Sequence, residues 1–420
     1  MAAAPFAAAA GGLLIPATAG AAPLPASGYR LTGRDHPLFA PRYPYEGVMR
    51  RLAPDLGPAV PLTAVAASAN RTAERVPQWP RPSGNPPYRF DVSPQRRLAG
   101  HAFRWDPNDF VTKRWRPQGI TQDYDGDGAS PAKTLLVSWY ARGSARNQGA
   151  RLTVVNWSQT GAITYRHVLL VEPFSERDDQ DELRDDIGAT DIHAGGIAWY
   201  GNHLYVADSG YLAARPIRVG IRVFDLRRFF KVARGPGVGR QPDGRTFHAH
   251  RYEYVLPQIY GYNWSGSARD LTFSQVSVDR TASGPGLLVS EYATDRRPRL
   301  APRLVRWPFL TAGGPDGLSP QAEWAATVPQ GLRTQGAVKV GSTYYLTTSK
   351  GSRRPGALRT WRDAAGATPR HRSRLNIGCE DLSYDGSGSG ALWTLGEYAN
   401  DEGEDDLRAP FSRYVYAVQP

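Results

Sequence analysis

A strand–turn–strand pattern recurs five times along this 420-residue chain. Each copy has an apolar strand, a turn rich in Gly and Asp, and a second strand of the Leu-Tyr-Val type. The copies begin at Gln118, Gly195, Ser274, Gln335 and Cys379. The copy GGIAWYGNHLYVADSG, residues 195–210, is the clearest, because apolar residues alternate on both sides of a Gly-Asn turn. An isolated hairpin is barely stable, so the copies must pack against one another.

A third strand follows every copy and a fourth follows the first four, which gives a count of 4-4-4-4-3. Four-stranded units repeated around an axis are typical of a β-propeller. The sequence therefore predicts an all-β fold, a propeller of five blades. The segment before the first copy, either HAFRW or FVTKRWRP, would complete the last blade and close the ring. Six blades are the alternative, if residues 210–273 hold a further blade.

Residues 1–27 contain an apolar run followed by small residues, which resembles a secretory signal although no basic residue precedes the run. We expect a Pro-rich, extended arm over 28–98 and the propeller over 99–420. The segment SERDDQDELRDDIG is the best candidate for a short helix. Export predicts an extracellular protein, and no other segment reaches the ~18 apolar residues of a membrane span.

The formal net charge of +12 comes almost wholly from arginine. With abundant Ala, Gly and Pro, this composition is typical of GC-rich, actinobacterial-type codon usage, so we expect no nucleic-acid partner. The single cysteine, Cys379, excludes an intramolecular disulfide and lies between strand-like residues, as a buried structural thiol does. The expected partner is a small molecule or glycan, bound by a monomer.

The copy at 195 and the strand GIRVFDL that follows it resemble the NHL-type repeat of gluconolactonase-like propellers, mainly over residues 195–226. The shared elements are G-I-A, L-Y-V-A-D-S and I-x-V-F-D, while the usual Asn-x-x-Ile ending is missing. The resemblance implies a propeller fold. It also implies, for some relatives, a divalent metal that activates water for lactone or phosphoester hydrolysis.

In a blade, the first strand begins and the second strand ends on the same face, so the residues there should form one ring at the channel mouth. Carboxylates and an imidazole at these positions are the candidate catalytic groups: Asp208, Glu291, Glu397, His193 and Glu380. Amides, aromatics and one further acid are the candidate substrate-binding groups: Gln118, Trp139, Tyr140, Gln275, Tyr292, Gln335, Asp381 and Tyr398. The plain alternative is that these carboxylates cap turns and pair with arginines, and that His193 is a satisfied channel residue.

The segment DYDGDG places Asp123, Asp125 and Asp127 at the first, third and fifth positions of a calcium-type loop. Thr134 stands where an EF-hand needs Glu, so the alternatives are a structural calcium ion or an ordinary Asp/Gly turn. The acidic runs at 176–186 and 400–406 flank the expected mouth, as solvated loops or lids. Arg-rich segments such as RHRSR read as solvated surface.

The sequence contains no Gly-rich phosphate loop, no G-x-S-x-G, no H-E-x-x-H and no paired C-x-x-C. These absences disfavour nucleotide enzymes, serine hydrolases and zinc proteases. Two functions remain. The first is an extracellular hydrolase or lyase that acts on a carbohydrate or lactone-like small molecule through the carboxylate ring. The second is a non-catalytic glycan- or ligand-binding propeller, with an interaction scaffold as a weaker third.

Overall fold

The computed structural model describes residues 22–37, 43–76, 90–130, 133–177, 180–210, 219–280, 284–292, 301–310, 314, 316–329, 331–352, 354–364, 366–399 and 412–420. Strands dominate these residues, as the predicted all-β class requires. The predicted hairpin at 195–210 is present as β10 (Ile197–Tyr200) and β11 (His203–Ala207). Gly201 makes its turn with a φ of 58°, a left-handed conformation that glycine adopts without strain.

In the described residues, the strands form five antiparallel units of four strands each. The first is β5 (Trp115–Gln122), β6 (Thr134–Ala141), β7 (Ala150–Asn156) and β8 (Ile163–Arg177). The second is β10, β11, β12 (Val219–Asp225) and β16 (Tyr254–Trp264). The third is β17 (Gln275–Asp279), β18 (Gly286–Ser290), β19 (Arg303–Pro308) and β20 (Trp324–Thr327).

The fourth unit is β21 (Thr334–Val340), β22 (Thr343–Thr348), β23 (Pro355–Trp361) and β24 (Arg370–Ile377). The fifth is β25 (Cys379–Asp385), β26 (Ala391–Gly396), β27 (Tyr414–Val418) and β4 (Arg97–Arg104). Strand β4 precedes the first unit in sequence and contains most of the HAFRW segment. Strand β3 (Arg71–Arg75) bridges the first and fifth units, because it pairs with both β8 and β4.

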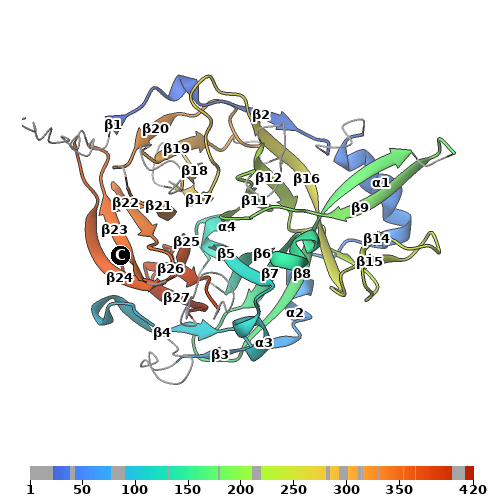
Figure 1. The fold of residues 1–420 in the computed structure, drawn as a ribbon, viewed down its shortest axis with the longest axis horizontal. Helices are drawn as coiled ribbons and strands as arrows, with labels where there is room; N and C mark the ends of the chain where they lie inside the picture. The colour runs from blue at the N-terminus through green and yellow to red at the C-terminus, as the bar shows by residue number, and fades with distance from the viewer. Residues whose placement is uncertain are drawn as a thin grey trace, which may run out of the picture.

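The five units lie around a common centre, with β5, β10, β17, β21 and β25 innermost (Figure 1). These innermost strands approach closely where they carry glycine: a Cβ on Gly119 would lie 2.8 Å from the Ile197 nitrogen. Asp381 of β25 reaches both of these strands, because its Oδ2 accepts hydrogen bonds from the main-chain nitrogens of Ile120 (2.9 Å) and Ile197 (3.2 Å). The centre is therefore held together by side chains that bind the backbone of neighbouring strands.

The expectation of an extended arm over 28–98 is wrong in part, because this region holds two α-helices. Helix α1 (Tyr45–Leu56) buries Tyr45, Val48, Met49, Leu52 and Leu56, an i, i+3, i+4, i+7 pattern that packs against β8 and its neighbours. Helix α2 (Leu62–Ala67) packs on the first two units. The short 3₁₀ helices η1 (Ala26–Gly28) and η2 (Pro94–Arg96) lie near the two ends of the arm.

Two strands of the arm extend the outer edges of the sheets. Strand β1 (Ala22–Pro23) pairs with β20, and β2 (Leu31–Arg34) pairs with β16. The predicted boundary after residue 27 is therefore wrong, because residues from Ala22 onward already belong to the folded unit. The rest of the signal-like segment lies outside the described residues.

The acidic segment at 175–188, expected as a helix, is instead part of a β-hairpin. Strand β8 runs out to Arg177 and returns as β9 (Leu183–Ala189). Helix α1 contacts this hairpin, because Arg51 donates two hydrogen bonds to the Asp185 carboxylate. Three short strands follow β12 and precede β16 in the sequence, and they extend this side of the molecule. They are β13 (Phe230–Lys231), β14 (Val238–Arg240) and β15 (Phe247–Ala249).

Tryptophan and aliphatic side chains from facing sheets fill the space between units. Trp105, Trp139 and Trp393 lie in one cluster with β4, β5 and β27 residues, and Trp307 lies in another between the second and third units. Three further short helices, α3 (Pro107–Val111), α4 (Asp123–Asp127) and η3 (Gly143–Gln148), join strands. No helix in the described residues is long and apolar enough to cross a membrane.

Candidate functional site

Two glutamates from the fifth unit face each other where its first strand begins and its second strand ends. Glu380 is the second residue of β25, and Glu397 follows β26 directly. Their side chains are hydrogen-bonded to each other, and they are only 3% and 7% exposed. Burial, together with the negative charge of Glu397, raises the pKa of Glu380 well above its usual range. The raised pKa favours the protonated form of Glu380, in direct hydrogen-bond contact with Glu397.

Two amides from other units donate to this carboxyl pair. The Nε2 atom of Gln118, on β5, lies 3.0 Å from Oε2 of Glu397, and Nε2 of Gln335, on β21, lies 3.0 Å from Oε1 of Glu380. Both glutamines were predicted at the channel mouth. Because an amide donor fixes one oxygen of each carboxyl, the pair is held in a defined orientation.

An arginine and a tyrosine complete the surroundings of Glu397. Arg116 of β5 lies 3.5 Å from Oε2 of Glu397, and its guanidinium stacks over the Tyr398 ring at 4.9 Å. The Tyr398 hydroxyl is hydrogen-bonded to Glu397, and burial is the main cause of its raised pKa. Tyr398 was predicted from the sequence, whereas Arg116 was missed, because one arginine among so many gives no signal of its own.

His193 and Tyr140 lie beside the pair, with ring centroids 4.4 Å apart. Burial lowers the pKa of His193 to about 4, and the nearby Glu397 only partly opposes this shift. His193 is therefore neutral at pH 7, able to accept or donate a hydrogen bond but not to supply a positive charge. Both residues are half-buried, so they form the outer rim of the carboxyl pair.

A carboxylic acid hydrogen-bonded to a carboxylate is suited to moving protons in both directions, as two acids that share one proton do. The arrangement differs from that of most glycosidases, whose two carboxyls stand about 5 Å or more apart, so that a nucleophile or a water fits between them. The direct contact between Glu380 and Glu397 therefore leaves less room between the carboxyl groups than these glycosidase mechanisms need.

Two other predicted catalytic carboxylates are neutralised by arginine, which corrects the expectation of a three-carboxylate ring. Glu291 is 3% exposed and accepts two 2.7 Å hydrogen bonds from Arg303, with Arg269 3.2 Å away. Asp208 is likewise buried, 2.9 Å from Nε of Arg222. Each of these carboxylates is occupied by hydrogen bonds from an arginine, so neither joins the carboxyl pair.

Three predicted substrate-binding residues are buried in the structure and do not face the mouth. Trp139 is 0% exposed and packs between Trp105 and the Arg151 guanidinium, because strand alternation turns it toward the core and Tyr140 toward the mouth. Gln275 accepts from the Ala337 nitrogen, and Asp381 binds backbone nitrogens at the centre. Tyr292 is half-buried next to Glu291, away from the carboxyl pair.

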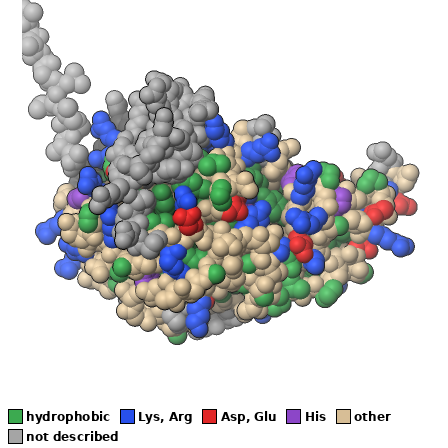
Figure 2. Space-filling model, turned by 90° about the horizontal axis from the view of Figure 1, so that it is seen from below, with side chains coloured by type: hydrophobic (Ala, Val, Ile, Leu, Met, Phe, Trp, Pro, Cys, Tyr) green, Lys and Arg blue, Asp and Glu red, His purple; other side chains and the backbone are tan. Residues whose placement is uncertain are grey.

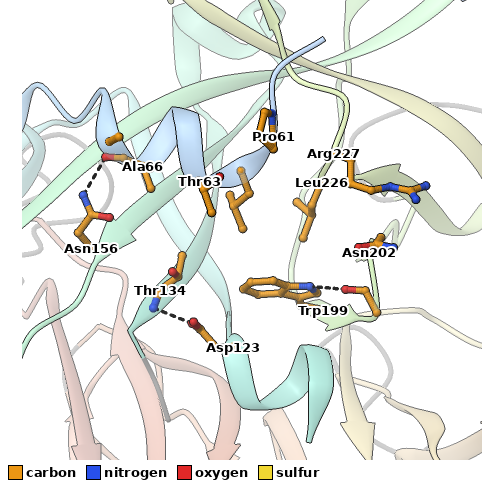
Figure 3. A pocket seen from close by; sticks show the side chains of 13 residues that line it. Pro61, Thr63, Ala66, Asp123, Thr134, Asn156, Trp199, Asn202, Leu226 and Arg227 are labelled. Atoms are coloured by element: carbon orange, nitrogen blue, oxygen red, sulfur yellow. Dashed lines mark hydrogen bonds between the residues drawn. The ribbon is translucent and has the colours of Figure 1, made fainter. Parts of the chain in front are cut away.

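The calcium expectation for the DYDGDG segment is not met, because the segment folds as helix α4 instead of a loop. Asp125 accepts from the hydroxyls of Thr121 and Ser383, Asp127 accepts from main-chain nitrogens, and Asp123 accepts from the Thr134 nitrogen at the edge of a cavity of about 500 Å³ (Figure 3). Within the described residues, no three His, Cys, Asp or Glu side chains form a group that could hold a metal ion.

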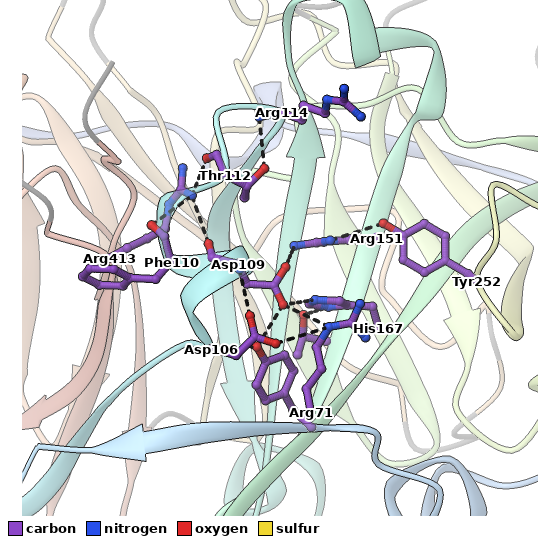
Figure 4. A network of polar contacts seen from close by, with 12 residues as sticks. Arg71, Asp106, Asp109, Phe110, Thr112, Arg114, Arg151, His167, Tyr252 and Arg413 are labelled. Carbon is purple, nitrogen blue, oxygen red and sulfur yellow. Dashed lines mark hydrogen bonds and ion pairs between the residues drawn. The ribbon is translucent and has the colours of Figure 1, made fainter. Parts of the chain in front are cut away.

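A second polar cluster, centred on Asp109, was missed entirely by the sequence reasoning (Figure 4). His167 lies 2.7 Å from the Thr153 hydroxyl and 2.8 Å from Asp109, and Arg151 pairs with Asp109 at 2.9 Å. Burial lowers the pKa of His167 to about 3. The pKa of Asp109 is also lowered, because its contacts with His167 and Arg151 outweigh burial. Thr153 is fully buried, so this Thr–His–Asp row joins β7 and β8 to α3.

Cys379 is buried next to the Glu380 main chain, and burial raises the pKa of its thiol. This agrees with a structural cysteine.

Lys and Arg side chains are scattered over the face seen in Figure 2, with acidic side chains between them.

No protein-family model matches this chain, and no curated protein matches it. Among solved structures, it is similar to the RS223 β-xylosidase, with 11% identity over 73% of this chain and 96% of that chain and a TM-score of 0.36. A luciferin-regenerating enzyme matches with 10% identity, 74% and 94% coverage and a TM-score of 0.34. Regucalcin, a calcium-binding protein from Agrobacterium tumefaciens, matches with 10% identity, 79% and 96% coverage and a TM-score of 0.31. The proposals below rest on the side chains of this chain.

Proposed function

We propose that the five units are the blades of a five-bladed β-propeller and that β4 closes it by completing the fifth blade. The pairing of β4 with β27 and the contacts of Asp381 with β5 and β10 support this arrangement. A closed ring leaves no exposed edge among the units. It also gathers β5, β21 and β25 at one end, where the carboxyl pair lies.

We further propose that the protein is a hydrolase that opens a lactone or cleaves a related ester in a small, carbohydrate-like molecule. The observation that carries this proposal is the hydrogen bond between the buried carboxyl groups of Glu380 and Glu397, which the amides of Gln118 and Gln335 hold in place. An acid and a base in direct contact can serve both steps of acyl hydrolysis. General acid–base catalysis of this kind contributes about 10²–10⁴-fold to a rate.

In the first step, Glu397 accepts a proton from water as the water oxygen attacks the carbonyl carbon, and Glu380 donates its proton to the carbonyl oxygen. In the second step, the C–O ring bond breaks as the carbonyl reforms. The proton on Glu397 passes to the departing ring oxygen, and one hydroxyl of the intermediate returns a proton to Glu380. Lactone and water thus become a hydroxy acid, and the carboxyl pair regains its starting state.

Hydrolysis of a panel of sugar lactones and aryl esters, followed by pH-stat titration, tests this function. We expect Glu380→Gln and Glu397→Gln each to lower kcat by about 10²–10⁴-fold. Glu46→Gln is the matched control, because Glu46 is an exposed residue of α1 that pairs with Arg228. Full activity in Glu380→Gln, with its folding verified by circular dichroism, would contradict the proposal.

A non-catalytic binding propeller is the second candidate, and the deep burial of both carboxyls favours it. Only 3% of Glu380 and 7% of Glu397 is exposed, so a ligand would meet chiefly Tyr140, His193 and Tyr398. This function predicts saturable binding of a glycan without turnover, and binding that survives Glu380→Gln. A turnover signal that disappears in Glu380→Gln excludes it.

Export also remains a proposal. The apolar run of residues 1–21 supports it, and cleavage after Ala19 or Ala21 would leave β1 intact in its sheet. Expression in a bacterial host with fractionation of the medium tests it. Retention of the protein in the cytoplasm with residues 1–21 intact would contradict export.

A further inference from the structure

A basic cavity of about 320 Å³ lies in the fourth unit, where β21 begins and β22 ends. Its lining residues come from three segments of the chain: Gly331, Leu332 and Arg333; Thr348, Ser349 and Lys350; Arg354 and Arg359. Four of these eight are cations, and none of the described residues in the lining is acidic. The cavity opens to solvent, so a ligand can reach it.

These cations differ from the buried arginines elsewhere in the molecule. Arg303, Arg222 and Arg306 each lie within 3 Å of a carboxylate oxygen. In the described part of the chain, no ion pair involves Lys350, Arg354 or Arg359; the Arg359 side chain lies 3.4 Å from the Thr348 hydroxyl. Like charges gathered without acids repel one another, and an anion between them would relieve this repulsion.

Electrostatic effects on neighbouring groups agree with a concentrated positive charge. Burial lowers the pKa of Arg359, which has no carboxylate to offset it. His371, opposite Arg359 on β24, has a lowered pKa because of burial and of the charges of Arg359, Lys350 and Arg374. Arg374 of the RHRSR segment, which is exposed as predicted from the sequence, adds its charge at His371.

The basic cavity adjoins the carboxyl pair. Arg333 lies two residues before Gln335, whose amide binds Glu380. Thr348, at the cavity wall, follows Thr347, whose hydroxyl donates a 2.7 Å hydrogen bond to the Glu380 carbonyl oxygen. The strands that support the carboxyl pair thus also form the wall of the cavity.

We propose that the basic cavity binds an anionic group of the substrate, a phosphate or a carboxylate, and so selects acidic sugar derivatives for the carboxyl pair. This inference rests on the proposed function and names its substrate class. Arginine forks bind both anions through two parallel N–H donors, and Lys350 adds a point charge. A neutral lactone would offer Lys350 and Arg359 no opposite charge.

Isothermal titration at low ionic strength tests the cavity directly, with inorganic phosphate in one arm and D-gluconate in the other to separate the two anions. We expect at least one of them to bind the wild type, and the Lys350→Gln/Arg359→Gln double variant to bind it at least tenfold more weakly. Arg362→Gln is the matched control, since this exposed arginine lines a different cavity. Absence of binding of both anions to the wild type, or unchanged binding by the double variant, would overturn the inference.

A comparison of substrates separates this inference from the function on which it rests. A phosphorylated or carboxylated sugar lactone should show a KM at least tenfold below that of its neutral counterpart, and the double variant should erase this difference with little change in kcat. Hydrolysis with equal KM values would sustain the proposed function and overturn the basic cavity. Anion binding that persists in a wild-type protein inactive on every lactone and ester would sustain the cavity and overturn the hydrolase.

Discussion

Glu291 in the third unit and Glu397 in the fifth occupy the same place in the repeating pattern, yet their surroundings differ. Each follows the second strand of its unit, and each is almost fully buried. Glu291 accepts two hydrogen bonds from Arg303, whereas Glu397 is hydrogen-bonded to the Glu380 carboxyl group. A repeated position thus serves stability in one unit and is available for chemistry in another.

An arginine on the third strand, or directly before it, accounts for this difference. Arg222 and Arg303 reach the carboxylates of Asp208 and Glu291. The corresponding arginine of the fifth unit, Arg413, donates to the carbonyl oxygens of Glu397 and of Thr112 near α3, at 2.9 and 2.6 Å. Helix α3 comes from the chain before the first unit, so the segment that completes the fifth unit also redirects its arginine.

The largest effect on stability should come from removing the cation in the third unit. Arg303→Leu leaves Glu291 buried beside only the half-exposed Arg269, so we expect the free energy of unfolding to fall by about 3–5 kcal/mol. Urea denaturation measures this loss. The Glu291→Leu/Arg303→Leu double variant should recover a large part of it, and a double variant as unstable as the single one would contradict the ion-pair explanation.

Asp125 is a third buried carboxyl, and its surroundings differ from those of both Glu291 and Glu397. It accepts from two hydroxyls, of Thr121 and Ser383, and burial raises its pKa to about 6. A carboxyl whose pKa is higher in the folded than in the unfolded state contributes less to the stability of the protein as pH rises. We therefore expect its contribution to the unfolding free energy to decline by about 2–3 kcal/mol from pH 4 to 6.

Denaturation at pH 4, 5, 6 and 7 for the wild type and Asp125→Asn measures that slope. The variant should lack this part of the decline, because asparagine does not titrate. Parallel curves for the two proteins would show that Asp125 titrates in the folded state as it does in the unfolded chain.

We expect the smallest change in stability from Glu380→Gln, a substitution for which we propose a large loss of activity. Burial and Glu397 raise the pKa of Glu380 and so favour its neutral form, which Glu380→Gln replaces with another neutral hydrogen-bonding group. We expect the free energy of unfolding to change by less than about 1 kcal/mol, as measured in urea at pH 7. A loss of more than about 3 kcal/mol would place Glu380 with Glu291 among the structural carboxylates.

The strand units could be predicted from the sequence, because alternating apolar residues and Gly turns are local signals. Helix α1 left such a signal as well, in the spacing of Val48, Met49, Leu52 and Leu56, but Pro residues on both sides obscured it. The acidic β8–β9 hairpin was misread because charged residues mask strand alternation when the strands project from the core.

The membership of the site was only partly predictable, because it depends on pairing between units. Position in the repeat found Glu380, Glu397, Gln118 and Gln335. It could not show that Arg303 neutralises Glu291 or that Trp139 faces the core, since both follow from which neighbour each strand face meets. The short helix at Asp123–Asp127 was missed for a different reason: carboxylates at alternate positions suit a loop, and the capping contact of Gln122 with the Tyr124 nitrogen starts a helix instead.

The protonation state of Glu380 tests most directly whether the Glu380–Glu397 pair differs from the arginine-bound Glu291. In protein labelled with ¹³C-glutamate, the side-chain carboxyl shift of Glu380, assigned by its loss in Glu380→Gln, can be followed by NMR from pH 3 to 8. We expect this signal to keep its protonated value through the range in which ordinary glutamates titrate, near pH 4–5, and to change only well above that range. Titration of Glu380 together with the exposed glutamates would contradict a shared proton and remove the basis for acid–base catalysis at this site.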